Sequence, residues 1–146
     1  MEFFTFHEFE YSDTAKIKHI NNVADDSVRR NLSILTDEVL DPARRAFGKP
    51  IKVNSGYRSK ALNEAIGGSA TSQHLTGCAA DLDGGDRNDN RRLAKLIVEL
   101  GLPFDQLIDE KNYAWVHVSH NPGGPQRGEI LRITNNKTKH ITAEEL

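Results

Sequence analysis

The sequence predicts a single α+β domain in which helices flank a small, mainly antiparallel sheet. The chain has 146 residues, a length that fits one domain, so we treat residues 1–146 as one unit. Two segments carry apolar residues at spacings of three and four, which is typical of amphipathic helices. Several short apolar or alternating segments are bounded by turn residues, as strands are.

The N-terminal half contains one long and one short helix around a strand. Residues 26–47 carry an apolar residue at every third or fourth position, and Gly48 follows as a helix stop. Pro42 lies inside this segment, so we expect a break or kink because proline lacks the N–H of a helix interior. The next expected elements are a strand at 51–55, a short helix at 59–66 and a loop at 69–77.

The C-terminal half supplies the rest of the sheet. We expect a strand at 78–83 and a second amphipathic helix at 91–100. Further strands are expected at 104–108, 115–119 and 130–133. The tail after Asn135 is polar, and we expect it to be loose.

Charge and composition exclude several classes of protein. The formal net charge is −2, so broad electrostatic binding to nucleic acid is not expected. No apolar run approaches the ~18 residues of a membrane span, so no membrane insertion is expected. The first residues lack the basic and apolar regions of a secretory signal, which predicts a cytoplasmic chain as synthesised. Cys78 is the single cysteine, which excludes an intramolecular disulfide.

Three residues suggest a metal site: His74, Asp81 and His117. Two imidazoles and a carboxylate are suitable zinc ligands, and three protein ligands leave a fourth position open, as in catalytic zinc sites. The spacing by itself also allows other roles. Asp81 could cap a turn, and His117 could be a hydrogen-bonded histidine of the core.

The surroundings of these residues match three short motifs in order. Residues 72–81 fit Ser-x-His-x-x-Gly-x-Ala-x-Asp, residues 115–117 fit Trp-x-His, and residues 55–59 fit Ser-x-Tyr-Arg-Ser. Together they resemble the zinc D-alanyl-D-alanine carboxypeptidase family, which includes murein endopeptidases and phage endolysin peptidases. The resemblance covers about residues 27–120. It implies the fold that this family shares with the Hedgehog signalling domain.

The resemblance also implies roles for individual residues. It implies that one Zn²⁺ per chain is bound by His74, Asp81 and His117. It implies that Arg58 holds a substrate carboxylate or polarises the scissile carbonyl, a role that suits a guanidinium because it is always charged and binds carboxylate bidentately. The alternative for Arg58 is an ordinary surface ion pair. The remaining residues expected to contact substrate are Ser72, Tyr57 and Trp115.

The general base is harder to assign. Many relatives carry an acidic residue three positions before the last zinc histidine, but Ala114 stands there in this chain. Phage-type relatives instead place a glutamate after a Gln-Leu-Ile strand, which corresponds to Glu110. We therefore expect Glu110 to be the base, with Asp109 as the second choice. Both acids could alternatively be solvated turn residues.

These observations predict a zinc-dependent peptidoglycan peptidase. It would cut a peptide bond in a stem or cross-bridge, as a D-Ala-D-Ala carboxypeptidase or an endopeptidase. An endolysin-type chain would act on the wall when released, for example by a holin, and we expect a monomer. One alternative is a non-catalytic, zinc-containing binding module on the same fold, and a second is a structural phage domain without metal.

Overall fold

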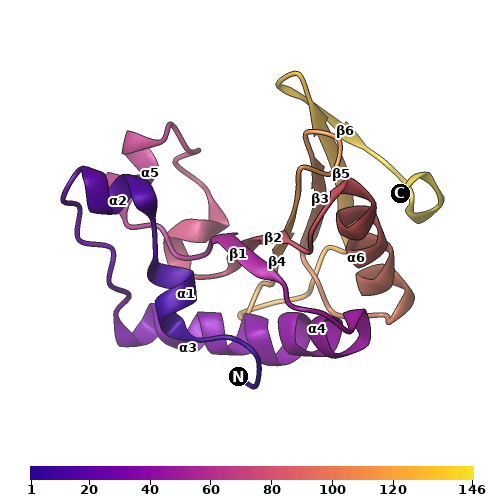
Figure 1. Ribbon diagram of the computed structural model, residues 1–146, viewed down its shortest axis with the longest axis horizontal. Helices are drawn as coiled ribbons and strands as arrows, with labels where there is room; N and C mark the ends of the chain where they lie inside the picture. The colour runs from indigo at the N-terminus through magenta and orange to yellow at the C-terminus, as the bar shows by residue number, and fades with distance from the viewer.

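The computed structural model describes residues 1–146 and confirms the predicted α+β fold (Figure 1). One six-stranded sheet has the strand order β1-β2-β4-β3-β5-β6. Only the pairing of β3 with β5 is parallel, and the other four pairings are antiparallel. The strands are β1 (Lys52–Ser55), β2 (Ala79–Asp83), β3 (Gln106–Glu110), β4 (Trp115–Ser119), β5 (Glu129–Thr134) and β6 (Lys137–His140).

Helices cover one face of this sheet and leave part of the other face open. The helices are α1 (Phe6–Glu10), α2 (Asp13–Ile17), α3 (Asp26–Leu35), α4 (Asp41–Phe47), α5 (Lys60–Ala65) and α6 (Arg87–Glu99). The fully buried core joins α3, α4 and α6 to the sheet through Leu82, Val116, Val118 and Leu107 of β2, β4 and β3. Helices α1, α2 and α5 form a lobe beside β1 (Figure 1). No helix combines the length and the apolar character that a membrane crossing requires.

Pro42 changes the helix without ending it. Helix α3 continues through a π-helical segment, Thr36–Leu40, into α4, where the N–H of Asp41 donates to the carbonyl of Thr36. Proline cannot donate to the turn before it and crowds that turn's carbonyl, which accounts for the wider turn at this point. The predicted long helix is therefore confirmed, and the break takes the form of a π-bulge.

The register of the central strands brings polar residues together on the open face. Asp81 pairs with His117, which in turn pairs with Ile108 of β3. Glu110 lies two residues beyond Ile108 and pairs with Trp115. Since side chains alternate between faces, these residues share the face opposite the helical core.

The prediction of a loose tail is wrong. Residues 137–140 form β6, paired antiparallel with β5 through a turn at Asn135 and Asn136, whose φ angles are +51° and +61°. Ile141 and Leu146 then pack into the core. Every residue of β6 is exposed and polar, so the hydrophobic pattern carries no strand signal, and the asparagine pair was the only cue.

Other differences are small. Strand β3 begins at Gln106 instead of residue 104, and α6 begins at Arg87 instead of residue 91 because Asp86 caps it. The expected loop at 69–77 contains a single 3-10 turn, Gln73–Thr76. This turn places His74 beside β2.

Candidate metal centre

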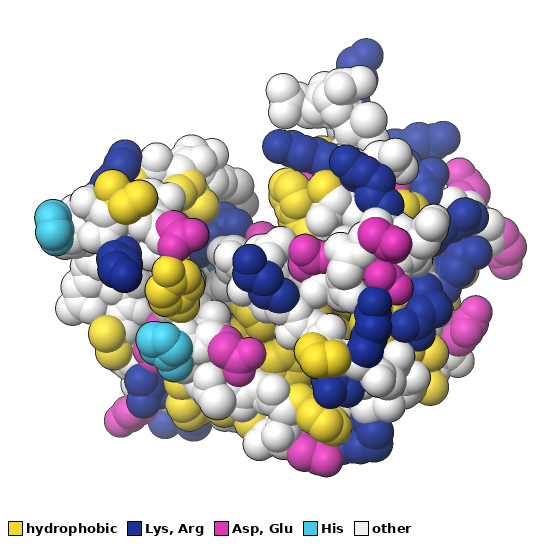
Figure 2. Space-filling view, viewed as in Figure 1, with side chains coloured by type: hydrophobic (Ala, Val, Ile, Leu, Met, Phe, Trp, Pro, Cys, Tyr) yellow, Lys and Arg dark blue, Asp and Glu magenta, His cyan; other side chains and the backbone are white.

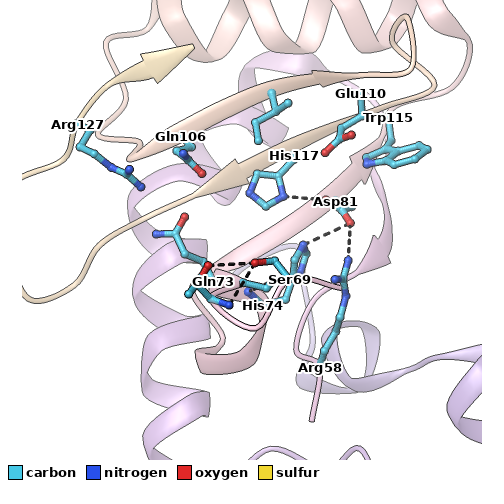
Figure 3. A pocket seen from close by; sticks show the side chains of 13 residues that line it. Arg58, Ser69, Gln73, His74, Asp81, Gln106, Glu110, Trp115, His117 and Arg127 are labelled. Atoms are coloured by element: carbon cyan, nitrogen blue, oxygen red, sulfur yellow. Dashed lines mark hydrogen bonds and ion pairs between the residues drawn. The ribbon is translucent and has the colours of Figure 1, made fainter. Parts of the chain in front are cut away.

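His74, Asp81 and His117 converge at the centre of the open face of the sheet (Figure 3). They come from the Gln73–Thr76 turn, from β2 and from β4. His117 Nδ1 lies 3.0 Å from Asp81 Oδ1, and His74 Nε2 lies 3.4 Å from Asp81 Oδ2. One ligand atom from each residue fits within 4.8 Å of the others. Tetrahedral zinc with bonds near 2.0–2.2 Å needs ligand atoms roughly 3.3–3.5 Å apart, so the group is close to that size.

The position of His74 follows from its short turn. Ser72 begins the turn by accepting a hydrogen bond from the N–H of His74, and Gly77 ends it at φ +74°. A Cβ on Gly77 would lie 2.7 Å from Val28 Cγ1, so only glycine lets the backbone pass this close to α3. The turn therefore holds His74 against the sheet before any ligand binds.

The tautomer of His74 is the one that a metal requires. Its Nδ1 lies 2.6 Å from the carbonyl oxygen of Gly56, which can only accept, so Nδ1 carries the proton. Nε2 is buried and has no hydrogen-bond partner. Its lone pair faces Asp81, and a metal-binding histidine usually donates its other ring N–H in this way. A buried lone pair without a partner is the feature that a bound cation would satisfy.

The charge states also fit a metal site. Burial lowers the pKa of His74 more than the nearby Asp81 raises it, so the imidazole is neutral. Burial by itself would raise the pKa of Asp81, but His74 and His117 outweigh burial and hold this pKa well below its usual range. Asp81 and His74 therefore offer an anionic carboxylate and a neutral imidazole, which are the forms that bind a divalent ion.

These ligands form the floor of a cavity of about 570 Å³, which we call the metal-site cavity. It lies between the loop that follows α5 and the strands β3 and β4, where Figure 2 shows a hollow between two lobes. Thirteen residues line it, and only two of them are hydrophobic. A cavity lined this way suits a polar substrate such as a peptide.

Comparisons with known proteins agree with this geometry. The family model described as Peptidase M15 matches residues 4–119. The chain belongs to the Peptidase M15 family. The match begins 23 residues earlier than the expected resemblance at residues 27–120, and so includes α1 and α2.

A curated relative, the zinc D-Ala-D-Ala carboxypeptidase of Streptomyces albus G, is 43% identical over 56 residues. The aligned stretch covers 38% of this chain and 22% of the relative, so the chain matches only a part of that protein. The family that matches is thus one described as peptidases, and the relative's name specifies a zinc enzyme. The His74, Asp81 and His117 group has donor atoms that suit such an ion.

Arg58 of this M15 protein lines the cavity and is firmly held. Its Nε donates to Ser55 Oγ at 3.0 Å, its Nη1 donates to Asn63 Oδ1 at 3.3 Å, and its Nη2 lies 3.3 Å from Asp81 Oδ2. The side chain is 14% exposed. Arg58 is therefore a largely buried partner of Asp81 and not a surface ion pair.

The two candidate bases lie on opposite faces of β3. Glu110 lines the metal-site cavity, and burial, followed by the nearby charge of Asp81, raises the pKa of its carboxyl group. Asp109 faces the helical side, where it accepts hydrogen bonds from Arg132 Nε at 2.7 Å and from the N–H of Tyr113 at 2.6 Å. This position argues against Asp109, the second choice, as a base.

The β3–β4 connection that follows Glu110 is unusually constrained. Lys111, Asn112 and Tyr113 all have positive φ, between +50° and +59°. Helix α6 secures this turn: Arg87 Nη1 donates to the carbonyls of Lys111 and Asn112, and Asn90 Nδ2 donates to that of Tyr113. The turn therefore returns the chain directly from Glu110 into β4.

The residues expected to contact substrate divide into two groups. Ser72 and Trp115 line the cavity, and Trp115 Nε1 is buried without a hydrogen-bond partner. Tyr57 does not line it: its backbone is tied to Phe9, and its ring packs against the core beside β1. The motif placed Tyr57 near the site, but its side chain points elsewhere.

Sequence reasoning did not assign six of the cavity residues to the site. Three of the six have long polar side chains, and these are Gln73, Gln106 and Arg127. Gln106 could have been found by alternation, because it lies two and four residues before Ile108 and Glu110 on the same strand. Gln73 stands beside a predicted ligand. Arg127 lies in an irregular segment between β4 and β5, where no motif marks it.

Proposed function

We propose that this protein hydrolyses a peptide bond in peptidoglycan and that His74, Asp81 and His117 hold its Zn²⁺. The observation that carries the proposal is the preformed ligand group on the floor of a polar cavity, with the Glu110 carboxyl in the same cavity. The bound ion would lower the pKa of a water to about 7 and polarise a carbonyl.

Glu110 is the proposed general base. A base works best when its pKa is close to the working pH, and burial moves the pKa of Glu110 toward that range. The carboxylate accepts a proton from the attacking water and passes it to the leaving amine. Arg58 stabilises the negative charge that develops on the carbonyl oxygen or holds a substrate carboxylate, in addition to fixing Asp81.

The finer assignment rests on the motifs and on the curated relative, whose name specifies D-Ala-D-Ala. On this support, the proposed substrate is a peptide of the wall stem or cross-bridge. The proposed type of peptidase is a carboxypeptidase or an endopeptidase. An endolysin-type role, with a monomer acting on the wall after release from the cell, agrees with the same motifs.

The test pairs metal analysis with activity on purified murein. We expect one zinc per chain and release of peptide amines that stops when a chelator removes the metal. The variant His117→Ala should lose both, whereas His140→Ala, an exposed histidine on β6, should lose neither. Zinc without release from walls of several chemotypes would instead support the non-catalytic binding module, which the alanine at position 114 favours.

A further inference from the structure

One end of the metal-site cavity is built from Gln73, Gln106 and Arg127, and we call it the amide end. In Figure 3 Arg127 and Gln106 lie on one side of the ligand group and Arg58 lies on the other. The amide end is therefore separate from the residues assigned to the metal and to the proposed base. Two carboxylates outside the cavity, Asp105 and Glu129, fix the orientation of its three side chains.

The two glutamines present their oxygens to the cavity. Gln73 Nε2 donates to Asp105 Oδ2 at 3.0 Å, and Gln106 Nε2 donates to Glu129 Oε1 at 2.6 Å. An ionised carboxylate can only accept, so the NH₂ group of each glutamine must face it. Neither glutamine Oε1 has a hydrogen-bond donor within the protein, which leaves two free acceptors on the cavity wall.

Arg127 supplies the matching donors. Its Nε and Nη2 form a bidentate pair with Asp105, with an Nη2–Oδ2 distance of 2.7 Å, and its backbone N–H also donates to Asp105. A guanidinium has a second donor edge, formed by Nη1 and the other Nη2 hydrogen. Nη1 donates no hydrogen bond within the protein, and the side chain is 56% exposed. The free edge is thus held in place by the occupied edge.

The local charge disfavours an anionic ligand. Asp105 is buried, and the hydrogen bonds from Arg127 lower its pKa to about 2, so it is ionised. Glu129 Oε1 lies 4.0 Å from Arg127 Nη1. Two carboxylates therefore surround one guanidinium, and a third carboxylate would meet a net negative environment. A neutral group that both accepts and donates hydrogen bonds fits better.

We propose that the amide end binds an uncharged carboxamide that the substrate peptide carries in place of a free carboxylate. Arg127 donates to the amide oxygen, and the oxygens of Gln106 and Gln73 accept from its N–H. The inference rests on the proposed function and deepens it, because it names a chemical group that the substrate carries beyond the scissile bond. The site therefore prefers an amidated wall peptide over the same peptide with a free carboxylate.

The probes are two stem pentapeptides that differ in one group. One contains D-glutamate with a free α-carboxylate, and the other contains D-isoglutamine, its carboxamide. We would measure kcat/KM for each with the zinc-loaded protein. We would also measure their affinity for zinc-loaded Glu110→Gln by the fluorescence of Trp115, which is the only tryptophan and lines the cavity.

The expected preference for the amide form is about 5- to 10-fold, the size of one like-charge contact at a solvated site. In the same background, Arg127→Gln should weaken binding of the amide form about 10-fold or more, because a hydrogen bond from a charged donor is lost. Glu129→Gln should improve binding of the acid form and so narrow the preference.

Arg132→Gln is the matched control. Arg132 is a residue of β5 and pairs with a buried aspartate, Asp109, at 2.7 Å, but it does not line the metal-site cavity. It should lose stability and leave the preference unchanged. Equal or stronger binding of the acid form, no loss of amide binding in Arg127→Gln, or no binding of either form would overturn the inference. Absence of hydrolysis with the amide preference intact would instead count against the proposed function alone.

Discussion

Replacing Glu110 by glutamine should separate chemistry from metal binding. The change keeps the shape of the side chain and removes its ability to accept a proton. A positioned general base contributes about 100- to 10,000-fold to a rate. At about 1.36 kcal/mol per factor of ten, this corresponds to a barrier increase of about 2.7–5.4 kcal/mol. Zinc content should not change, because Glu110 is not one of the three clustered ligand residues.

The assay is the pH profile of kcat/KM with a soluble stem peptide. Glu110 must be deprotonated to act, so activity falls as the pH drops through its pKa, which burial raises above its ordinary value of 4.5. This acidic limb should disappear from the residual activity of Glu110→Gln. The matched control is Glu99→Gln, which changes an exposed acid at the end of α6, outside the cavity, and should keep the limb.

Two results would refute this assignment. One is zinc-loaded Glu110→Gln with clearly more than about a hundredth of the wild-type kcat, since a general base contributes at least about 100-fold. The other is an acidic limb that persists in the variant, because the titrating group would then be a different one.

Three further predictions concern stability. Gly77→Ala should lower the free energy of unfolding by about 2–5 kcal/mol in denaturant titrations. The left-handed backbone costs alanine about 1–2 kcal/mol, and overpacking against α3 costs about 1–3 kcal/mol. The control Gly67→Ala, with φ +73° but open space around it, should lose only the backbone contribution of about 1–2 kcal/mol. The pKa of Asp105 is lowered to about 2 from 3.8, so its ion pair with Arg127 stabilises the fold above pH ~4. The melting temperature should therefore fall between pH 4 and 2, and this fall should be less steep in Asp105→Asn. Ile141→Ala should cost about 2–5 kcal/mol, whereas a loose tail would leave stability unchanged.

The central part of this fold is predictable because its signals are local. The spacing of apolar residues in α3 and α6 and the alternation around His117 lead directly to the observed helices and to β4. The three candidate ligands could be chosen because the residues around them follow a motif, not because of their spacing. The register that places Asp81 opposite His117 then confirms that they meet.

Other features depend on contacts between distant parts of the chain. Strand β6 is entirely polar and exists because it pairs with β5, so no hydrophobic pattern marks it. Arg127 faces the cavity because Asp105, 22 residues earlier, binds both its backbone and its side chain. Tyr57 lies in a motif beside the site, yet its ring does not line the cavity. A motif predicts that a residue is near the site but not the direction of its side chain.

The left-handed turn after Glu110 has a consequence for how the site works. Three successive residues with positive φ cost roughly 1–2 kcal/mol each, less for asparagine, and the turn persists because α6 and Asp109 hold it. The Glu110 carboxylate thus projects from the last residue of β3, beside a turn that hydrogen bonds from α6 and to Asp109 hold in place. The backbone position of Glu110 is therefore set when the chain folds. No further ordering of this backbone is needed when a ligand enters the cavity.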